Sequence, residues 1–310
     1  MIIYLNQRAN NHTGEKKLNK IYDKLQSRVE ELGAGIIIED IPKDPSDSLI
    51  SHIEKGENTF IAGGGDGTVH SLLNALMKLP ESVRKDVVFG AIGLGSSNDF
   101  HKPMSKLNMI KGIPIKIDFT NAIDHNVAQT NYITDTGQSV SEYFIINGSM
   151  GATADINHKF NNGDKMVSWL KPKWVDGCIY YCGLNVFLNY QNVKATIEVN
   201  EVSHETEISN LGFLIYPNFA GKFKYDTPVT PQSDYFCVNL AENMTKIEQS
   251  ISTFNLYLHR FYNLPKTKSW NTQEVTINVD EPTTFEMDGE VRMVKKVSIR
   301  LLKGALTVCQ

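Results

Sequence analysis

Cysteine is scarce in this chain of 310 residues, and its four thiols do not form a zinc or redox motif. The thiols have no Cys-x-x-Cys spacing and no histidines at zinc-ligand spacing; they are Cys178, Cys182, Cys237 and Cys309. Reduced thiols are typical of cytoplasmic proteins, so we expect a cytoplasmic location. The pattern argues against a zinc module or a disulfide framework.

Long apolar runs and an excess of one charge are also missing. No segment approaches the run of about 18 apolar residues that a membrane-spanning helix needs. The apolar start ends at Asn6 and is too short for a signal peptide, so we expect a strand there. The formal net charge is −4, which gives no cationic field for nucleic acid. We therefore expect no nucleic acid partner, and only local, transient contact with a membrane.

The first third of the chain alternates between strand-like and helix-like spacing. Apolar residues recur at helical intervals over 15–32, 45–53 and 69–79, and short apolar runs that are typical of buried strands occupy 2–5, 36–38, 59–62 and 87–92. This alternation predicts a doubly wound, Rossmann-like α/β domain over residues 1–120. Ligands of such sheets bind beyond the carboxyl ends of the strands.

The remaining residues, 121–310, have a different texture. Turn residues separate short strand-like stretches at 143–147, 193–199, 212–216, 235–240, 274–279 and 297–302. This spacing predicts a second domain, a mainly antiparallel β-sandwich. One helical insert is expected over 174–190.

The strongest local signal is the run Gly63-Gly64-Gly65-Asp66-Gly67-Thr68, between an expected strand and an expected helix. Glycines let the backbone approach a bulky anion, and a helix start offers N–H groups to phosphate. The run is neither a Walker A loop nor a GxGxxG motif. It predicts a phosphate-binding loop, with a tight turn as the alternative. Asp66 would hold Mg²⁺, accept a proton, or cap its helix.

Two weaker signals occur further along the chain. The segment 93–100 follows the next expected strand and contains Gly95-Ser96-Ser97-Asn98-Asp99, which alone is ordinary turn chemistry. Asp288-Gly289-Glu290 is a hairpin signal, although a hairpin does not explain Glu290. Segment 93–100 follows the strand after the glycine run, so we expect both loops at the same edge of the sheet. This position favours a functional role for the segment.

Together these segments resemble the diacylglycerol kinase catalytic domain family, which also includes sphingosine and ceramide kinases. The family pattern runs from an early Asn through GGDGT and GTGNDF to a late DGE, and matching segments occur here in the same order. The resemblance implies an ATP- and Mg²⁺-dependent kinase that phosphorylates a membrane lipid reached from the membrane surface. Whether the chain forms a homodimer is left open by the sequence.

The resemblance also assigns roles to individual residues. The catalytic residues would be Asp66, Glu290 and, less securely, Asp118. The residues at the nucleotide would be Asn6, Gly63, Gly64, Gly65, Gly67, Thr68, Gly95, Ser96, Ser97 and Asn98. A structural Mg²⁺ would involve Asp99 through water and Asp234 directly.

The chain departs from the family pattern at several of these places. Ser96-Ser97 replaces Thr-Gly, Ser71 replaces a Glu, and Tyr235 follows Asp234 where the family has Gly. Three alternatives therefore stay open: a small-molecule kinase of the NAD kinase type, a non-catalytic nucleotide or lipid binder, and a Rossmann oxidoreductase. The glycine spacing argues against the last.

Overall fold

The structure, a computed structural model, describes residues 1–171 and 173–310 and divides into two compact units. The first unit comprises Met1–Val127 and Leu302–Gln310, and the second comprises Ala128–Leu301. The sequence alone places every residue after 120 in the second domain. In the structure the C-terminal residues 302–310 belong to the first unit.

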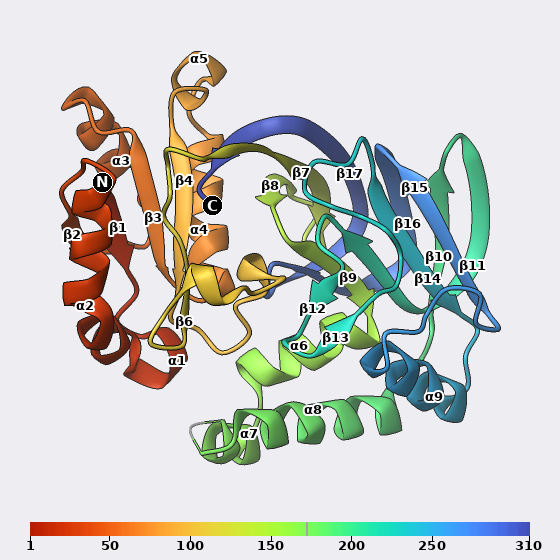
Figure 1. The fold of residues 1–310 in the computed structure, drawn as a ribbon. Coiled ribbons are helices and arrows are strands. Elements are labelled where there is room, and N and C mark those ends of the chain that lie inside the picture. Colours follow the sequence, from red (N-terminus) through yellow and green to blue (C-terminus); the bar gives the residue numbers. More distant parts are fainter. Residues whose placement is uncertain (172) are drawn as a thin grey trace. The chain divides into compact units, whose positions relative to one another are not determined.

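A parallel sheet with the strand order β2–β1–β3–β4 organises the first unit (Figure 1). A helix follows each of the first three strands in the chain, which gives the doubly wound arrangement expected from the sequence. The elements are β1 (Ile2–Leu5), α1 (Ala9–His12), α2 (Gly14–Glu31), β2 (Ile37–Asp40), α3 (Ser46–Glu54), β3 (Thr59–Gly64), α4 (Asp66–Met77), α5 (Glu81–Arg84) and β4 (Val88–Gly93).

The two faces of this sheet bury different side chains because neighbouring residues of a strand point in opposite directions. Ile3 of β1 and Ile61 of β3 pack in one core cluster with Leu18 and other apolar residues of α2. Tyr4 stacks on Phe60, and its hydroxyl lies 2.7 Å from the Ser48 hydroxyl of α3. Helices therefore cover both faces of the sheet.

Short elements follow β4 and complete the first unit. They are η1 (Asp99–His101), η2 (Lys106–Asn108), β5 (Met109–Ile110) and β6 (Ile113–Lys116), and β6 pairs antiparallel with β4. The last strand of the chain, β17 (Glu290–Val308), contributes Thr307 and Val308, which pair in parallel with Val88 and Phe89 of β4. The C-terminus thus adds a strand to the first sheet.

The second unit is rich in antiparallel strands, as the sequence predicts, so the predicted fold class is confirmed. Its strands follow the order β15–β14–β11–β10–β16–β17, and β9 pairs with both β11 and β16. The strands are β7 (Ile123–Thr134), β8 (Ser139–Phe144), β9 (Asn147–Gly151), β10 (Val193–Val199), β11 (Val202–Leu214), β12 (Asn218–Phe219), β13 (Phe223–Lys224), β14 (Phe236–Glu242), β15 (Thr267–Thr272) and β16 (Glu274–Met287).

One expected strand is divided in two. The sequence predicts a strand over 143–147, but the structure ends β8 at Phe144 and begins β9 at Asn147. The Asp288 carboxylate accepts hydrogen bonds from the N–H groups of Ile145, Ile146 and Asn147 at 2.9–3.3 Å. These N–H groups bond to a side chain in place of a neighbouring strand, so the ladder breaks there.

Four helices of the second unit are α6 (Ala152–Asn162), α7 (Lys165–Leu170), α8 (Val175–Asn189) and α9 (Lys246–Tyr257). The expected insert over 174–190 corresponds to α8, whereas the other three are additions that the sequence reading did not anticipate. No helix in the described part of the chain has the length and apolar character that a membrane crossing requires.

We expect the C-terminal residues 302–310 to contribute to the free energy of unfolding of the first unit. Leu306 is 1% exposed, so we expect Leu306→Ala to lower the free energy of unfolding by about 2–5 kcal/mol through lost burial and a cavity. Chemical denaturation measures the change. Leu107→Ala is the matched control, because Leu107 is 80% exposed, and it should change the same quantity by less than about 0.5 kcal/mol. Equal effects of the two substitutions would contradict this assignment.

Candidate functional site

Two loops follow the adjacent parallel strands β3 and β4 and are joined by their backbones. The N–H groups of Leu94 and Gly95 both donate to the carbonyl oxygen of Gly64, at 2.8 and 3.2 Å. Parallel strands end at the same edge of a sheet, so their following loops lie together. The structure thus brings the glycine run and the segment 93–100 into one place, as the sequence predicts.

Close packing between the loops explains part of their glycine content. A Cβ atom on Gly95 would lie 2.5 Å from the Cα atom of Gly65, and one on Gly64 would lie 2.1 Å from the Thr68 hydroxyl. Real Cβ atoms do not tolerate such distances. Glycine at 64 and 95 is therefore required by packing alone, whatever ligand the loops bind.

The Asp66 carboxylate ties the second loop to the start of α4. One of its oxygens accepts from the N–H of Asp99 at 3.2 Å, and the other accepts from the N–H of Phe100 at 3.3 Å. Gly65 is the N-cap of α4, and Asp66 is its first residue. Asp66 therefore holds the start of η1, and the capping role that the sequence offered for it stays a prediction.

Asn6 and Thr68 connect the end of β1 to the same helix. The Asn6 amide donates to the Thr68 hydroxyl at 3.0 Å, and the Asn6 N–H donates to the carbonyl of Gly63 at 2.8 Å. Thr68 is buried. The structure thus brings Asn6 and Thr68 together with the glycine run, as expected for members of one site.

Lys17 is a residue of this site that sequence reasoning missed. Its ammonium group donates to the carbonyl oxygens of Leu94 at 2.9 Å and Gly95 at 3.1 Å. Desolvation by burial lowers the pKa of Lys17 below its usual value. In the sequence it is one of two adjacent lysines in a helix with an exposed polar face, so no local signal separates it from a surface lysine.

The accessible parts of the two loops are short. Gly65–Gly67 and Gly95–Ser97 are partly or fully exposed, whereas Asn98 and the residues that follow it in η1 are buried. Asn98 adopts the left-handed conformation, and its amide donates to the carbonyls of Gly93 and Gly95. Its carboxamide oxygen is buried and has no hydrogen-bond partner within residues 1–171 and 173–310.

Asp99 is paired with a cation. Its carboxylate lies 2.5 Å from the ammonium of Lys102, and both side chains are largely buried. The described residues contain no group of three or more His, Cys, Asp or Glu side chains that could hold a metal ion. The role of Asp99 in a metal site therefore stays a prediction.

Asp118 lies in the first unit, two residues after the end of β6, within a local turn. Its carboxylate accepts from the side chains and N–H groups of Thr120 and Asn121 at 2.6–3.2 Å. Burial raises the pKa of Asp118, but these hydrogen bonds outweigh burial and lower it overall. The geometry gives Asp118 a structural task as a turn cap, and its catalytic role is untested.

A buried basic group packs behind the second loop. The ammonium of Lys116 lies 4.7 Å from the centre of the Phe100 ring, and Phe100 also contacts the rings of His101 and His125. Burial lowers the pKa of Lys116 to about 8. Burial and the nearby charge of Lys116 lower the pKa of both histidines to about 3. Both rings are therefore neutral at pH 7.

In the second unit, the Asp288–Glu290 hairpin contains one buried carboxylate and one exposed carboxylate. Asp288 is buried, and its carboxylate accepts hydrogen bonds from the N–H groups of residues 145–147. The Glu290 side chain is 45% exposed, and its carboxylate lies 3.7 Å from the Arg292 guanidinium. Buried Glu286, which sequence reasoning missed, accepts from the N–H of Gly289 and from the Ser149 hydroxyl. The hairpin is thus held from within while Glu290 remains accessible.

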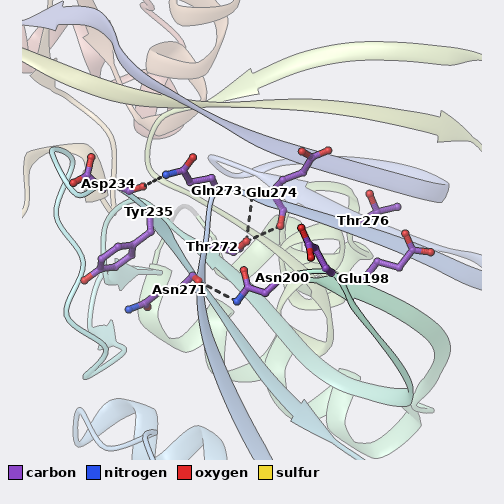
Figure 2. A pocket seen from close by; sticks show the side chains of 10 residues that line it. Glu198, Asn200, Asp234, Tyr235, Asn271, Thr272, Gln273, Glu274 and Thr276 are labelled. Carbon is purple, nitrogen blue, oxygen red and sulfur yellow. Dashed lines mark hydrogen bonds between the residues drawn. The ribbon is translucent and has the colours of Figure 1, made fainter.

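Asp234 lines an open pocket of about 700 Å³ in the second unit (Figure 2). Three further acids line the same pocket: Glu198, Glu201 and Glu274. The Asp234 carbonyl accepts from the Gln273 amide at 2.9 Å, and the Asp234 side chain is exposed. Asp234 therefore belongs to an acidic surface of the second unit, and its role as a metal ligand is untested.

The resemblance drawn from the sequence is confirmed by comparison with known proteins. Residues 4–137 match the diacylglycerol kinase catalytic domain. A protein from Yersinia enterocolitica named "Probable lipid kinase YegS-like" is 37% identical over 93 residues, which are 30% of this chain and 28% of that protein. Its namesake from Yersinia pestis is 34% identical over 94 residues, with the same coverage. The matched segment thus spans about a quarter of the curated relatives.

Solved structures support the fold across the whole chain. The structure of a diacylglycerol kinase from Bacillus anthracis superposes with a TM-score of 0.65 at 16% identity, covering 99% of this chain and 95% of that one. A second structure from the same organism gives a TM-score of 0.72 at the same identity, covering 99% and 94%. At this identity the likeness concerns the fold alone.

The buried histidines should make stability depend on pH. His125 has a pKa of about 3 in the folded chain and 6.5 as its ordinary value, so between these values the unfolded chain binds more protons. The free energy of unfolding should therefore fall as the pH drops, by about 1.4 kcal/mol per unit per histidine once the pH is well below 6.5. Chemical denaturation from about pH 6 to about pH 4 measures this slope.

The matched variant is His125→Gln, whose amide can still donate to the Asn126 carbonyl as the ring nitrogen does at 2.7 Å. The slope of the free energy of unfolding against pH should be smaller for this variant by about 1.4 kcal/mol per pH unit, which corresponds to one bound proton. The contribution of His101 should be retained. Identical slopes for the two proteins would show that His125 is protonated equally in the folded and unfolded chain, contrary to its burial.

Proposed function

Because residues 4–137 match the diacylglycerol kinase catalytic domain, we propose that this chain is an ATP-dependent lipid kinase. It would transfer the γ-phosphate of ATP to a hydroxyl group of a lipid, of the diacylglycerol or long-chain base type. One observation carries the proposal: Asp66 fixes two loops together while Gly65–Gly67 and Gly95–Ser97 remain accessible.

These accessible segments have the chemistry that a nucleotide phosphate requires. Helix α4 begins at Asp66, and the first turn of a helix offers N–H groups and a positive dipole end to an anion. Glycine at 65 and 67 places no side chain over that backbone. The Lys17 ammonium, on the carbonyls of the second loop, adds positive charge. The first unit therefore fits a nucleotide triphosphate.

Magnesium would arrive with the nucleotide and supply neutralisation of phosphate charge. A resident metal has less support, because Asp99 is paired with Lys102 and the described residues hold no cluster of metal-ligating side chains. We therefore propose Mg²⁺ as the companion of ATP. The structural site that would use Asp99 and Asp234 is retained only as a prediction.

The acceptor hydroxyl must lose its proton during transfer, and Asp66 is our candidate for the group that positions it or takes that proton. An ionised carboxylate can accept more than two hydrogen bonds, so this role is compatible with its bonds to the N–H groups of Asp99 and Phe100. Glu290, which is accessible on its hairpin, is the candidate for a second group near the transferred phosphate.

The lipid branch is favoured over a small-molecule kinase of the NAD kinase type by sequence. Asn98-Asp99-Phe100 and the late Asp288-Gly289-Glu290 both follow the pattern of lipid kinases. The identity of the lipid is a question for a substrate panel of diacylglycerol, long-chain bases and NAD.

We expect Asp66→Ala to lower lipid phosphorylation at least about 100-fold, because it removes both the proposed proton acceptor and the tie between the loops. Transfer of labelled phosphate from ATP to each substrate of the panel, dispersed in detergent, measures activity. The matched control is Asp47→Ala, since Asp47 is also an aspartate in the first turn of a helix of the first unit and should leave activity unchanged.

Circular dichroism on the same preparations checks that the Asp66→Ala protein remains folded. Activity within a few-fold of wild type in that protein would contradict the role of Asp66. If only NAD is phosphorylated, or if ATP binds and no substrate of the panel yields product, the lipid kinase proposal fails.

Glu290→Gln should lower the turnover number by about tenfold or more while the free energy of unfolding changes by less than about 0.5 kcal/mol. Stability should hold because Arg292 keeps its two hydrogen bonds to Glu142 at 3.0 and 3.1 Å. Steady-state kinetics with the best lipid of the panel, alongside denaturation, separates the two effects. Glu281→Gln, an exposed acid on β16, is the control, and equal kinetics in the two variants would remove Glu290 from the site.

A further inference from the structure

The helices of the second unit present large apolar side chains to solvent. On α8, Tyr180, Leu184 and Leu188 are 59–63% exposed and recur every four residues, so they share one face. The opposite face of α8 is already used, because Cys178, Cys182 and Val186 are buried. The outward residues of α8 therefore do not belong to the core.

Helix α9 repeats this arrangement. Ile247, Ile251 and Phe254 are 56–73% exposed, and their spacing of four and three residues places them on one face. Leu258, one turn further on, is also exposed. Gln249, Ser252 and Leu256 lie on the buried side of the helix. An amphipathic helix normally turns its apolar face inward, so the orientation of α9 is unusual.

The two helices are neighbours within the second unit, and the residues between them connect them directly. The Lys246 ammonium donates to the carbonyl of Leu188, and the Asn192 amide donates to the carbonyl of Met244 at 3.2 Å. Helices α7, α8 and α9 lie along one edge of this unit (Figure 1). We call the exposed apolar residues of the two longer helices the α8–α9 face: Tyr180, Leu184, Leu188, Ile247, Ile251, Phe254 and Leu258.

Aromatic and basic side chains accompany this face. Trp169 and Trp174, in and after α7, are both more than half exposed. The Lys173 ammonium lies 4.1 Å from the centre of the Trp169 ring. Lys165 and Lys246 are exposed at the starts of α7 and α9. Tryptophan and lysine are the residues that proteins place at the boundary between lipid and water.

Two acids that are close to Lys165 and Lys246 in the sequence, Asp164 and Glu248, are engaged with other groups. The Asp164 carboxylate lies 3.6 Å from the Lys159 ammonium and accepts from the Tyr181 hydroxyl. Glu248 pairs with Lys266 at 2.7 Å. The chain as a whole carries a net charge of −4, so exposed lysines beside an apolar face are a local departure from its average charge. Such a combination is complementary to a surface of anionic lipid.

We propose that the α8–α9 face docks on the surface of a membrane that contains anionic lipid. The proposal deepens the proposed function, on which the choice of a membrane as partner partly rests, since a lipid kinase must reach a substrate held in a bilayer. A second copy of the chain is a poorer occupant. A dimer through this face would bring two sets of exposed lysines into one interface, where like charges repel.

Sedimentation of the full chain with vesicles, without ATP, tests the proposal independently of catalysis. One set of vesicles contains phosphatidylcholine alone, and the other contains equal parts of phosphatidylcholine and phosphatidylglycerol. We expect binding to the anionic vesicles, and an affinity at least about tenfold lower for the double variant Ile251→Gln with Phe254→Gln. Lys165→Gln with Lys173→Gln should weaken binding to the anionic vesicles only.

The matched control is Leu107→Gln with Val202→Gln, which replaces two apolar residues that are also more than half exposed but lie outside the face. This control should bind as wild type. Equal binding by the Ile251/Phe254 variant, or no binding by wild type, overturns the proposal. So does a wild-type dimer in light scattering that the Ile251/Phe254 variant converts to a monomer.

The same proteins separate failure of this proposal from failure of the proposed function. Phosphorylation of detergent-dispersed diacylglycerol by a wild-type chain that does not bind vesicles would leave the kinase intact and remove the docking surface. Vesicle binding that depends on Ile251 and Phe254, in a chain that phosphorylates no lipid, would keep the surface and remove the kinase.

Discussion

The arrangement of the two loops in the first unit depends on one carboxylate, which accepts hydrogen bonds from two backbone N–H groups of a segment that is distant in the sequence. Asp66 stands at the start of α4, and the N–H groups it binds belong to Asp99 and Phe100 beyond the next strand. The backbones of the two loops also meet directly, because the N–H groups of Leu94 and Gly95 donate to the Gly64 carbonyl. The Asp66 carboxylate adds two hydrogen bonds that hold the start of η1 against the start of α4.

The second unit uses the same device at its own turn. Asp288 is buried and binds three N–H groups of residues 145–147, which would otherwise lack partners where β8 ends and β9 begins. Buried N–H groups without partners are costly, so the carboxylate fixes the course of the chain between the two strands. In both units, the aspartate of a short sequence motif therefore organises the backbone, and residues beside it in the motif remain accessible.

The proximity of the two loops in the first unit could be predicted from the sequence, because each loop is a local sequence pattern. Contacts made by residues from other elements could not be predicted in this way. The glycine run, the second loop and the alternation of strands and helices are local patterns, and the structure brings their residues together. Lys17 contacts the second loop from a different helix, so only the fold reveals it. Helix α9 could have been found, because Thr245 and Glu248 form a capping box, but its apolar residues face outward and do not signal a core.

The outward orientation of α8 and α9 illustrates why burial cannot be inferred from composition alone. Periodicity identifies an apolar face, but it does not state whether protein, lipid or water covers that face. In α8 the inner face is filled by small thiols and a valine, while the larger Leu184 and Leu188 lie outside. Exposure of large side chains costs free energy in water, so a chain that retains them on two adjacent helices gains from a partner that removes them from water. The lysines beside these helices are complementary to an anionic lipid surface, which is the partner proposed above.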